Sequence, residues 1–379
     1  MSTHVAALDG LRGLAATVVV IRHTFNAISM PVPLRRQILE SPLALVLNAQ
    51  GAVQLFFVLS GWVLAASLAR SAEKVPWTAF YARRVFRIHL PYVAAIGLAW
   101  IATTAWVLPD DAAVTRWLTR VRVDGVSPAQ FASALTFPGT AYGLLVVGWT
   151  LRLEMLYSMV VPLLVLAARF LRGLPLLLGA AFAFATPIVD LWYGMDFVLG
   201  VVAFQQRAVL AQLFAKLRAP GRALALLGAC LLFAAPVAFA TDRVVAEIIR
   251  TGDGPSYVAM MAIASAVFVA LAASGFAPVL AWRPFLFLGR ISYSLYLVHL
   301  TVLALVAPRV LVKMVVASKL ITVTAATAGS AFALFAIVLG LSILLAIPLH
   351  RYVERPSIAL GARASRWLVR RHLARVPGS

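Results

Sequence analysis

The sequence has a single cysteine, Cys230, and few charged residues. One cysteine excludes an internal disulfide and any metal site of the CxxC type. Charged residues make up 12% of the 379 residues, about half the share found in soluble domains, while 63% are hydrophobic. This composition excludes an ordinary soluble domain and indicates an integral membrane protein.

Acidic residues are scarce as well: 13 Asp and Glu stand against 33 Lys and Arg, which gives a formal net charge of +20. In a soluble protein this excess would suggest nucleic-acid binding. Here the basic residues cluster between apolar stretches, so membrane topology and anionic lipid explain them better. We therefore expect the lipid bilayer as a partner and no nucleic acid.

Ten apolar stretches are long enough to cross a bilayer, and each should be a helix because lipid offers the backbone no other hydrogen-bond partners. We predict an all-α polytopic bundle of about ten transmembrane helices, over residues 12–30, 43–68, 85–107, 143–168, 174–189, 191–206, 223–240, 257–275, 285–307 and 326–349. Lys and Arg are more numerous on the side of the two termini, so the positive-inside rule predicts that both termini are cytoplasmic.

The chain then divides into a transmembrane domain, 1–356, and a basic cytoplasmic tail, 357–379. The tail is interpreted as an amphipathic segment on the membrane surface. The longest hydrophilic connection, 109–142, would face the outside and is a candidate lid or acceptor contact.

Two ionisable residues, Arg12 and His23, lie eleven residues apart in the first predicted span. Eleven residues at 100° each end about 20° beyond three full turns, so both side chains share nearly one helix face. The rise of about 16 Å puts Arg12 near one membrane surface and His23 near the midplane. Ionisable groups at that depth are costly, which favours a role in chemistry on an anionic substrate. The alternative is a structural pair: a histidine hydrogen-bonded between helices and an interfacial arginine.

A cluster of arginines opens the third predicted span, in FYARRVFRIHLPY. Arg84 and Arg87 are three residues apart and share a helix face, while Arg83 is offset. Arginines bind phosphates through planar bidentate hydrogen bonds. The cluster therefore predicts a phosphate site, with positive-inside anchoring as the alternative.

Polar side chains also lie inside two later spans, in GWTLRLEMLYS and GRISYSLYLVHL. Glu154 is a carboxylate at membrane depth, and a carboxylate can orient an imidazole or form a structural ion pair. We assign Glu154 and Asp9 as candidates to orient or balance His23. The candidates for substrate contacts are Trp149, Tyr157, Tyr296 and His299.

Two further motifs have simpler interpretations. In LFFVLSGWVL, Ser60 and Gly61 predict close helix packing. In HRYVERP, at the end of the last span, Glu354 and Arg355 are interpreted as interfacial residues on the cytoplasmic side.

Taken in order, six motifs resemble the membrane-bound acyltransferase 3 family, over residues of about 9 to 356. They are ALDGLRGLAATVVVIRHTF, FFVLSGWVL, RRVFRIHLPY, GWTLRLEMLYS, GRISYSLYLVHL and HRYVERP. The family's Arg-x10-His motif maps onto Arg12 and His23, and its Arg-x-x-Arg motif onto Arg84 and Arg87. One departure is Thr150, where the family usually has serine; threonine keeps the hydroxyl.

The resemblance implies a multi-pass enzyme of the bacterial inner membrane that uses cytoplasmic acyl-CoA, most commonly acetyl-CoA. The acyl group would go to a hydroxyl of a carbohydrate or glycolipid acceptor, and no metal is expected. We expect Arg12, Arg83, Arg84 and Arg87 to hold the donor's phosphates. His23 would act as general base on the acceptor hydroxyl or as a transient acyl carrier.

A different class of function uses similar residues. A proton-coupled secondary transporter could relay protons through His23 and Glu154. We find no internal repeat in the sequence. Binding of coenzyme A separates the two classes, because an acyltransferase needs it and an exporter does not.

Overall fold

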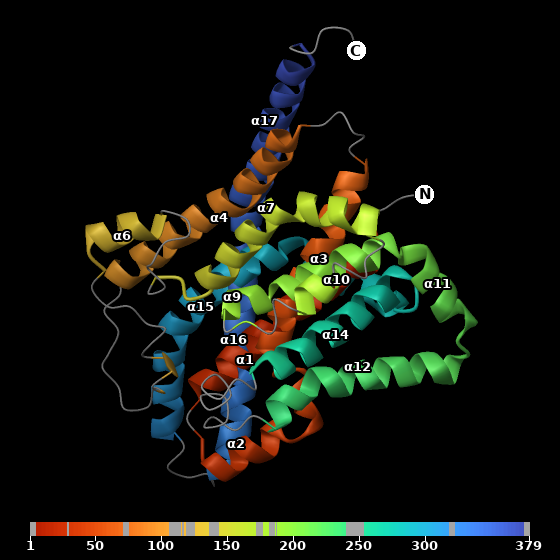
Figure 1. Ribbon diagram of the computed structural model, residues 1–379. Coiled ribbons are helices and arrows are strands. Elements are labelled where there is room, and N and C mark those ends of the chain that lie inside the picture. Colours follow the sequence, from red (N-terminus) through yellow and green to blue (C-terminus); the bar gives the residue numbers. More distant parts are fainter. Residues whose placement is uncertain are drawn as a thin grey trace. The chain divides into compact units, whose positions relative to one another are not determined.

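The computed structural model is all-helical within the residues it describes, as the sequence predicted (Figure 1). These residues are 5–28, 30–70, 76–105, 115, 117–118, 126–135, 144–171, 177–181, 186, 188–239, 254–317 and 323–374. Of the predicted hydrophilic connection 109–142, only residues 115, 117–118 and 126–135 belong to this set.

Seven helices of the described chain are long and apolar enough to cross a membrane. They comprise α3 (Ala49–Arg70, with the preceding turn η1, Pro42–Leu45), α4 (Trp77–Ala105), α7 (Gly148–Leu171), α12 (Ala219–Phe239), α14 (Gly254–Ala273), α15 (Arg283–Ala317), and α16 (Val323–Leu349) continuing into α17 (Arg355–Leu373). The segments Asp190–Gln205 and Arg207–Lys216 meet at a bend of 76° and would add one more if they form a single span.

The predicted count of ten and the cytoplasmic placement of the termini therefore stay predictions. The first predicted span is helix α1 (Ala6–Ala27), which is continuous over Arg12 and His23 but falls outside the seven. Its ionisable residues lower its hydropathy. Half of the predicted span 174–189 lies outside the described residues.

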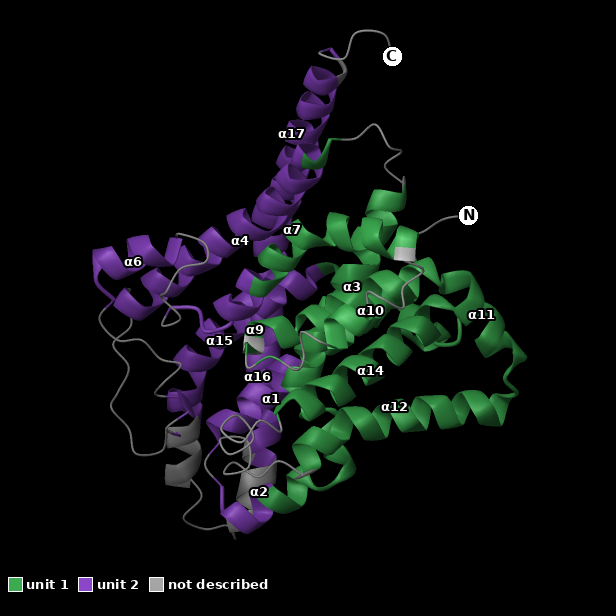
Figure 2. Cartoon of the chain, viewed as in Figure 1, with its two compact units in different colours: residues 1–18, 36–77, 153–290 green, residues 19–35, 78–152, 291–379 purple. Residues whose placement is uncertain are grey.

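The chain divides into two compact units, coloured separately in Figure 2. Unit 1 comprises residues 1–18, 36–77 and 153–290, and unit 2 comprises 19–35, 78–152 and 291–379. The shorter elements are α2 (Val32–Leu39), α6 (Pro128–Leu135), α9 (Val189–Trp192), α10 (Gly194–Gln205), α11 (Arg207–Lys216), the turn η2 (Pro278–Ala281) and the π-helical turn η4 (His350–Glu354).

In unit 1, α3 packs against α10 and α14, and α14 packs against α12. Glycines allow α3 and α10 to approach each other very closely. A Cβ on Gly61 would overlap the carbonyl oxygen of Phe197, and a Cβ on Gly200 would overlap that of Val58. The predicted close packing at Gly61 is thus confirmed, and its partner is α10.

In unit 2, hydrogen bonds fix α15 against two neighbours. Tyr293 Oη donates to the carbonyl oxygen of Ile88 in α4 at 2.7 Å. Ser294 Oγ donates to Glu354 Oε2 at 2.7 Å, and His350 Nδ1 lies 2.9 Å from the same oxygen. Glu354 is buried, and the π-helical turn directs its carboxylate to the serine of α15. Its predicted position at the cytoplasmic interface stays a prediction.

The residues predicted as a basic tail form most of α17, which extends α16 through η4. Ser357, Gly361 and Ser365 are buried at a spacing of four residues, one helix face. A Cβ on Gly361 would lie 3.0 Å from the Cβ of Phe86 and 3.3 Å from the Cα of Arg83, both in α4. Small residues therefore let this helix pack directly on the basic start of α4, while Arg363 and Arg366 are exposed.

Candidate active site

Two histidines of unit 2, His23 and His299, are in direct contact. His23 Nδ1 lies 2.8 Å from Nε2 of His299, and the two rings are nearly parallel, with centroids 5.0 Å apart and 4° between their planes. His299 has no exposed surface and His23 is half-buried. The sequence analysis assigned His299 to the same site as His23. It did not predict the contact between the two rings.

The hydrogen bonds assign a proton to each ring when both are neutral. His299 Nδ1 lies 2.7 Å from the carbonyl oxygen of Tyr296, which can accept a hydrogen bond but not donate one. His299 therefore carries its proton on Nδ1, and its Nε2 accepts. His23 must then donate from Nδ1, which leaves a lone pair on its Nε2. That nitrogen can take a proton from a hydroxyl group.

A second hydrogen-bonded link ties Tyr296 to the start of α7. Thr150 Oγ1 donates to the carbonyl oxygen of Val147 at 2.8 Å and lies 2.9 Å from Tyr296 Oη. Threonine has one hydroxyl proton, so Tyr296 is the donor to Thr150. The hydroxyl at position 150 therefore holds α15 in place beside the histidine pair.

Part of the hydrophilic connection lies against His23. The ring of Trp117 is 5.4 Å from that of His23, at 29° between planes. Thr115 Oγ1 donates to the carbonyl oxygen of Asn26 at 2.9 Å and accepts from the amide of Leu118 at 3.3 Å. This segment therefore covers the imidazole with an indole and is anchored one turn beyond it on α1.

The arginine cluster belongs to the same unit. Arg84 is buried, and Arg83 and Arg87 are half-buried. All three lie on α4 shortly before Ile88. The carbonyl of Ile88 accepts the hydrogen bond from Tyr293, so this turn of α4 lies level with Tyr293 on α15. His299 follows Tyr293 by six residues, about 9 Å along the helix. The histidine pair and the turn of α4 that follows the arginines are thus linked through one helix, α15.

A comparison with known protein families finds a match over most of the chain. The family model described as an acyltransferase domain matches residues 5–351, which is most of the chain. The chain belongs to the acyltransferase 3 family. A search of curated proteins and a search of solved structures found no match. Membership in this family, together with the membrane-spanning helices, supports a multi-pass membrane acyltransferase.

In this member of the acyltransferase 3 family, several predicted site residues meet in unit 2. His23, Tyr296 and His299 are joined by contacts, and Trp149 precedes Thr150 at the start of α7, half-buried. The sequence did not single out Trp117. Trp117 lies in a hydrophilic connection without a helical pattern of apolar residues. Its contact with His23 depends on the tertiary fold, which the local sequence does not specify.

Other predicted residues belong to unit 1. Glu154 accepts a hydrogen bond from Ser60 Oγ at 3.3 Å. Tyr157 donates to the carbonyl of Asp190 at 2.8 Å and stacks on Phe197 with centroids 4.9 Å apart, which is a packing role between α7 and α10.

Asp9 precedes His23 by fourteen residues on α1, about 21 Å of helix, and Arg12 lies one turn further along than Asp9. The orienting roles assigned to Asp9 and Glu154 stay predictions. The partner of His23 in the structure is His299. No group of three or more potential metal-ligating side chains occurs among the described residues.

Proposed function

We propose that this member of the acyltransferase 3 family transfers an acyl group, most commonly acetyl, from cytoplasmic acyl-CoA to a hydroxyl of a carbohydrate or glycolipid at the bacterial inner membrane. The observation that supports this most strongly is the His23–His299 pair, which leaves the Nε2 lone pair of His23 available as a base. The arginines of α4 supply cations suited to the phosphates of the donor.

In the proposed reaction, the acceptor O–H gives its proton to Nε2 of His23 as the oxygen attacks the thioester carbonyl. The new C–O bond forms, the C–S bond breaks, and the proton passes to the departing thiolate of coenzyme A. His299 acts as a positioning residue, because its Nε2 fixes the tautomer and orientation of His23. Arg12, Arg83, Arg84 and Arg87 are proposed to hold the phosphates.

An acyl-His23 intermediate is the alternative course. There Nε2 itself attacks the thioester, coenzyme A leaves, and the acceptor hydroxyl then displaces the imidazole. Both courses use the same nitrogen and the same hydrogen bond to His299. Labelled acetate covalently bound to His23, recovered when acceptor is withheld, would distinguish this course from direct transfer.

One observation favours a proton-coupled transporter as a second candidate. Asp196 in α10 is fully buried, and neither carboxylate oxygen has a hydrogen-bond partner among the described residues. Carboxyl groups at membrane depth relay protons in pumps and transporters. A transporter of this kind has no need for coenzyme A, so binding of that nucleotide decides between the two.

We expect Arg87→Gln to weaken coenzyme A binding about tenfold or more, because it removes charge-assisted hydrogen bonds to phosphate. Titration calorimetry on the purified protein measures this directly. Arg36→Gln is the matched control: Arg36 is exposed and pairs with Glu40, so its loss should change the Kd less than twofold. Equal affinities for all three proteins, or no binding by the parent, would contradict the proposal.

A further inference from the structure

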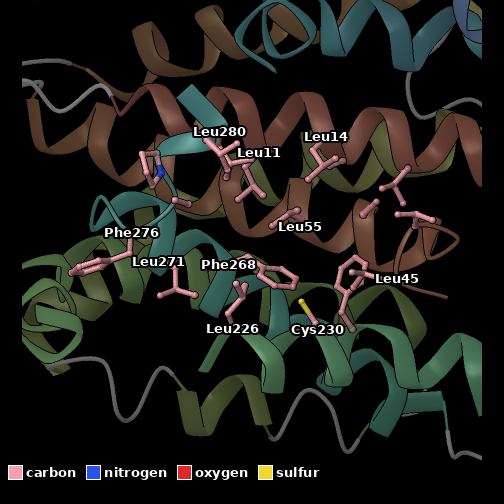
Figure 3. Close-up of a pocket in the computed structure, with 18 of the residues that line it drawn as sticks. Leu11, Leu14, Leu45, Leu55, Leu226, Cys230, Phe268, Leu271, Phe276 and Leu280 are labelled. Atoms are coloured by element: carbon pink, nitrogen blue, oxygen red, sulfur yellow. The ribbon is translucent and has the colours of Figure 1, made fainter. Parts of the chain in front are cut away.

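Unit 1 contains an apolar cavity of about 680 Å³ that the proposed reaction does not use. Side chains from α1, α3, α12, α14 and the segment around η2 line it (Figure 3). Leu14, Leu226 and Val279 on its walls are exposed, so the cavity opens at the surface of the chain. Among the described residues that line it, Arg222 is the single charged side chain.

The position of Arg222 gives the cavity a polar end. Its guanidinium lies over the ring of Phe276, 4.5 Å from the centroid. Figure 3 shows Phe276 at one end of the lined space and Leu45 at the other, with Cys230 and Phe268 between. The wall formed by α12 runs from Arg222 to Phe233, eleven residues or about 16 Å.

These dimensions match one leaflet of a bilayer. Half of a hydrocarbon core about 30 Å thick is about 15 Å, the depth reached by one lipid acyl chain. Arg222 lies in the first turn of α12, a candidate membrane-spanning helix, where a headgroup phosphate would be expected. Basic residues between such helices recognise anionic headgroups.

We propose that this cavity is a binding site for an anionic glycerophospholipid, with one acyl chain along α12 and the headgroup phosphate at Arg222. Lipid tails are equally apolar in the bilayer and in the cavity, so the selectivity must come from the arginine. The site prefers a phosphate that carries net negative charge over a zwitterionic headgroup. It does not depend on the acyltransferase reaction.

Native mass spectrometry of the delipidated full-length protein tests this, with dioleoyl phosphatidylglycerol and dioleoyl phosphatidylcholine as probes and no acyl donor present. We expect one phosphatidylglycerol to bind at least about fivefold more tightly than phosphatidylcholine, the scale of one basic residue at a membrane surface. Arg222→Gln should abolish this preference, and Arg222→Lys should keep it. Arg218→Gln is the matched control and should keep it, because Arg218 is exposed and immediately precedes α12.

A second variant tests the cavity itself. Cys230→Trp places a large ring in the middle of the lining and should remove the bound lipid, while the melting temperature of the protein reports whether it is folded. Equal effects of Arg222→Gln and Arg218→Gln, or lipid still bound in a folded Cys230→Trp, would overturn the proposal. Lipid-free dimers in the same spectra would also overturn it, since a second copy would then cover the cavity.

Discussion

Replacing His23 with glutamine is expected to lower acyl transfer about 100-fold or more, the range that a positioned general base contributes. Glutamine can keep a hydrogen bond to His299 but has no basic nitrogen in place of Nε2. Coenzyme A affinity should stay within twofold, because the arginines proposed to hold its phosphates are unchanged. The measurement is transfer of label from acetyl-CoA in membranes that contain the natural acceptor, alongside binding by the purified protein.

His372→Gln is the matched control for this substitution. His372 is exposed in the last turn of α17, so its loss should leave transfer unchanged. Transfer by His23→Gln at the parent rate would remove the imidazole from the mechanism. A loss of coenzyme A binding together with transfer would instead give His23 a role in the donor site.

The second large effect concerns stability. Gly200→Val is expected to destabilise unit 1 by about 3 kcal/mol or more, because the first side-chain carbon would already overlap the backbone of α3 at Val58. The helices would have to separate, which opens the contact between α3 and α10. Thermal unfolding in detergent, and the amount of folded protein recovered, measure this.

Gly228→Val is the control for this substitution. A Cβ at Gly228 meets nothing within 4 Å in α12, so the change should alter the unfolding free energy by about 1 kcal/mol or less. Similar losses of unfolding free energy in both variants would mean that the close helix contact at Gly200 does not make a side chain there more destabilising than elsewhere.

Much of the fold follows from apolar length. The helices of the described chain lie near the predicted spans because each long apolar run has one way to satisfy its backbone in lipid. Gly61 was correctly interpreted as a packing residue, since small side chains permit close helix contacts. Helix lengths and helix breaks are harder to predict from the sequence. No residue pattern in η4 indicates a π-helical turn that buries Glu354.

The site could be predicted only in part. Spacing along one helix correctly put Tyr296 and His299 on one face, because that depends on helix geometry alone. The contact between His23 and His299 joins residues 276 apart in sequence, and no local pattern specifies it. The same is true of Trp117 on His23 and of Thr150 with Tyr296.

The most direct test of the histidine pair is a double-mutant comparison of His23→Gln, His299→Leu and both together, scored by acetyl transfer. His299→Leu alone should slow transfer about tenfold or more, and His299→Gln should restore part of it by returning an acceptor near the position of Nε2. Because His299 is proposed to act through His23, the double variant should be no slower than His23→Gln. Independent, multiplied losses, or a His23→Gln variant that transfers acetyl at the parent rate, would contradict the account.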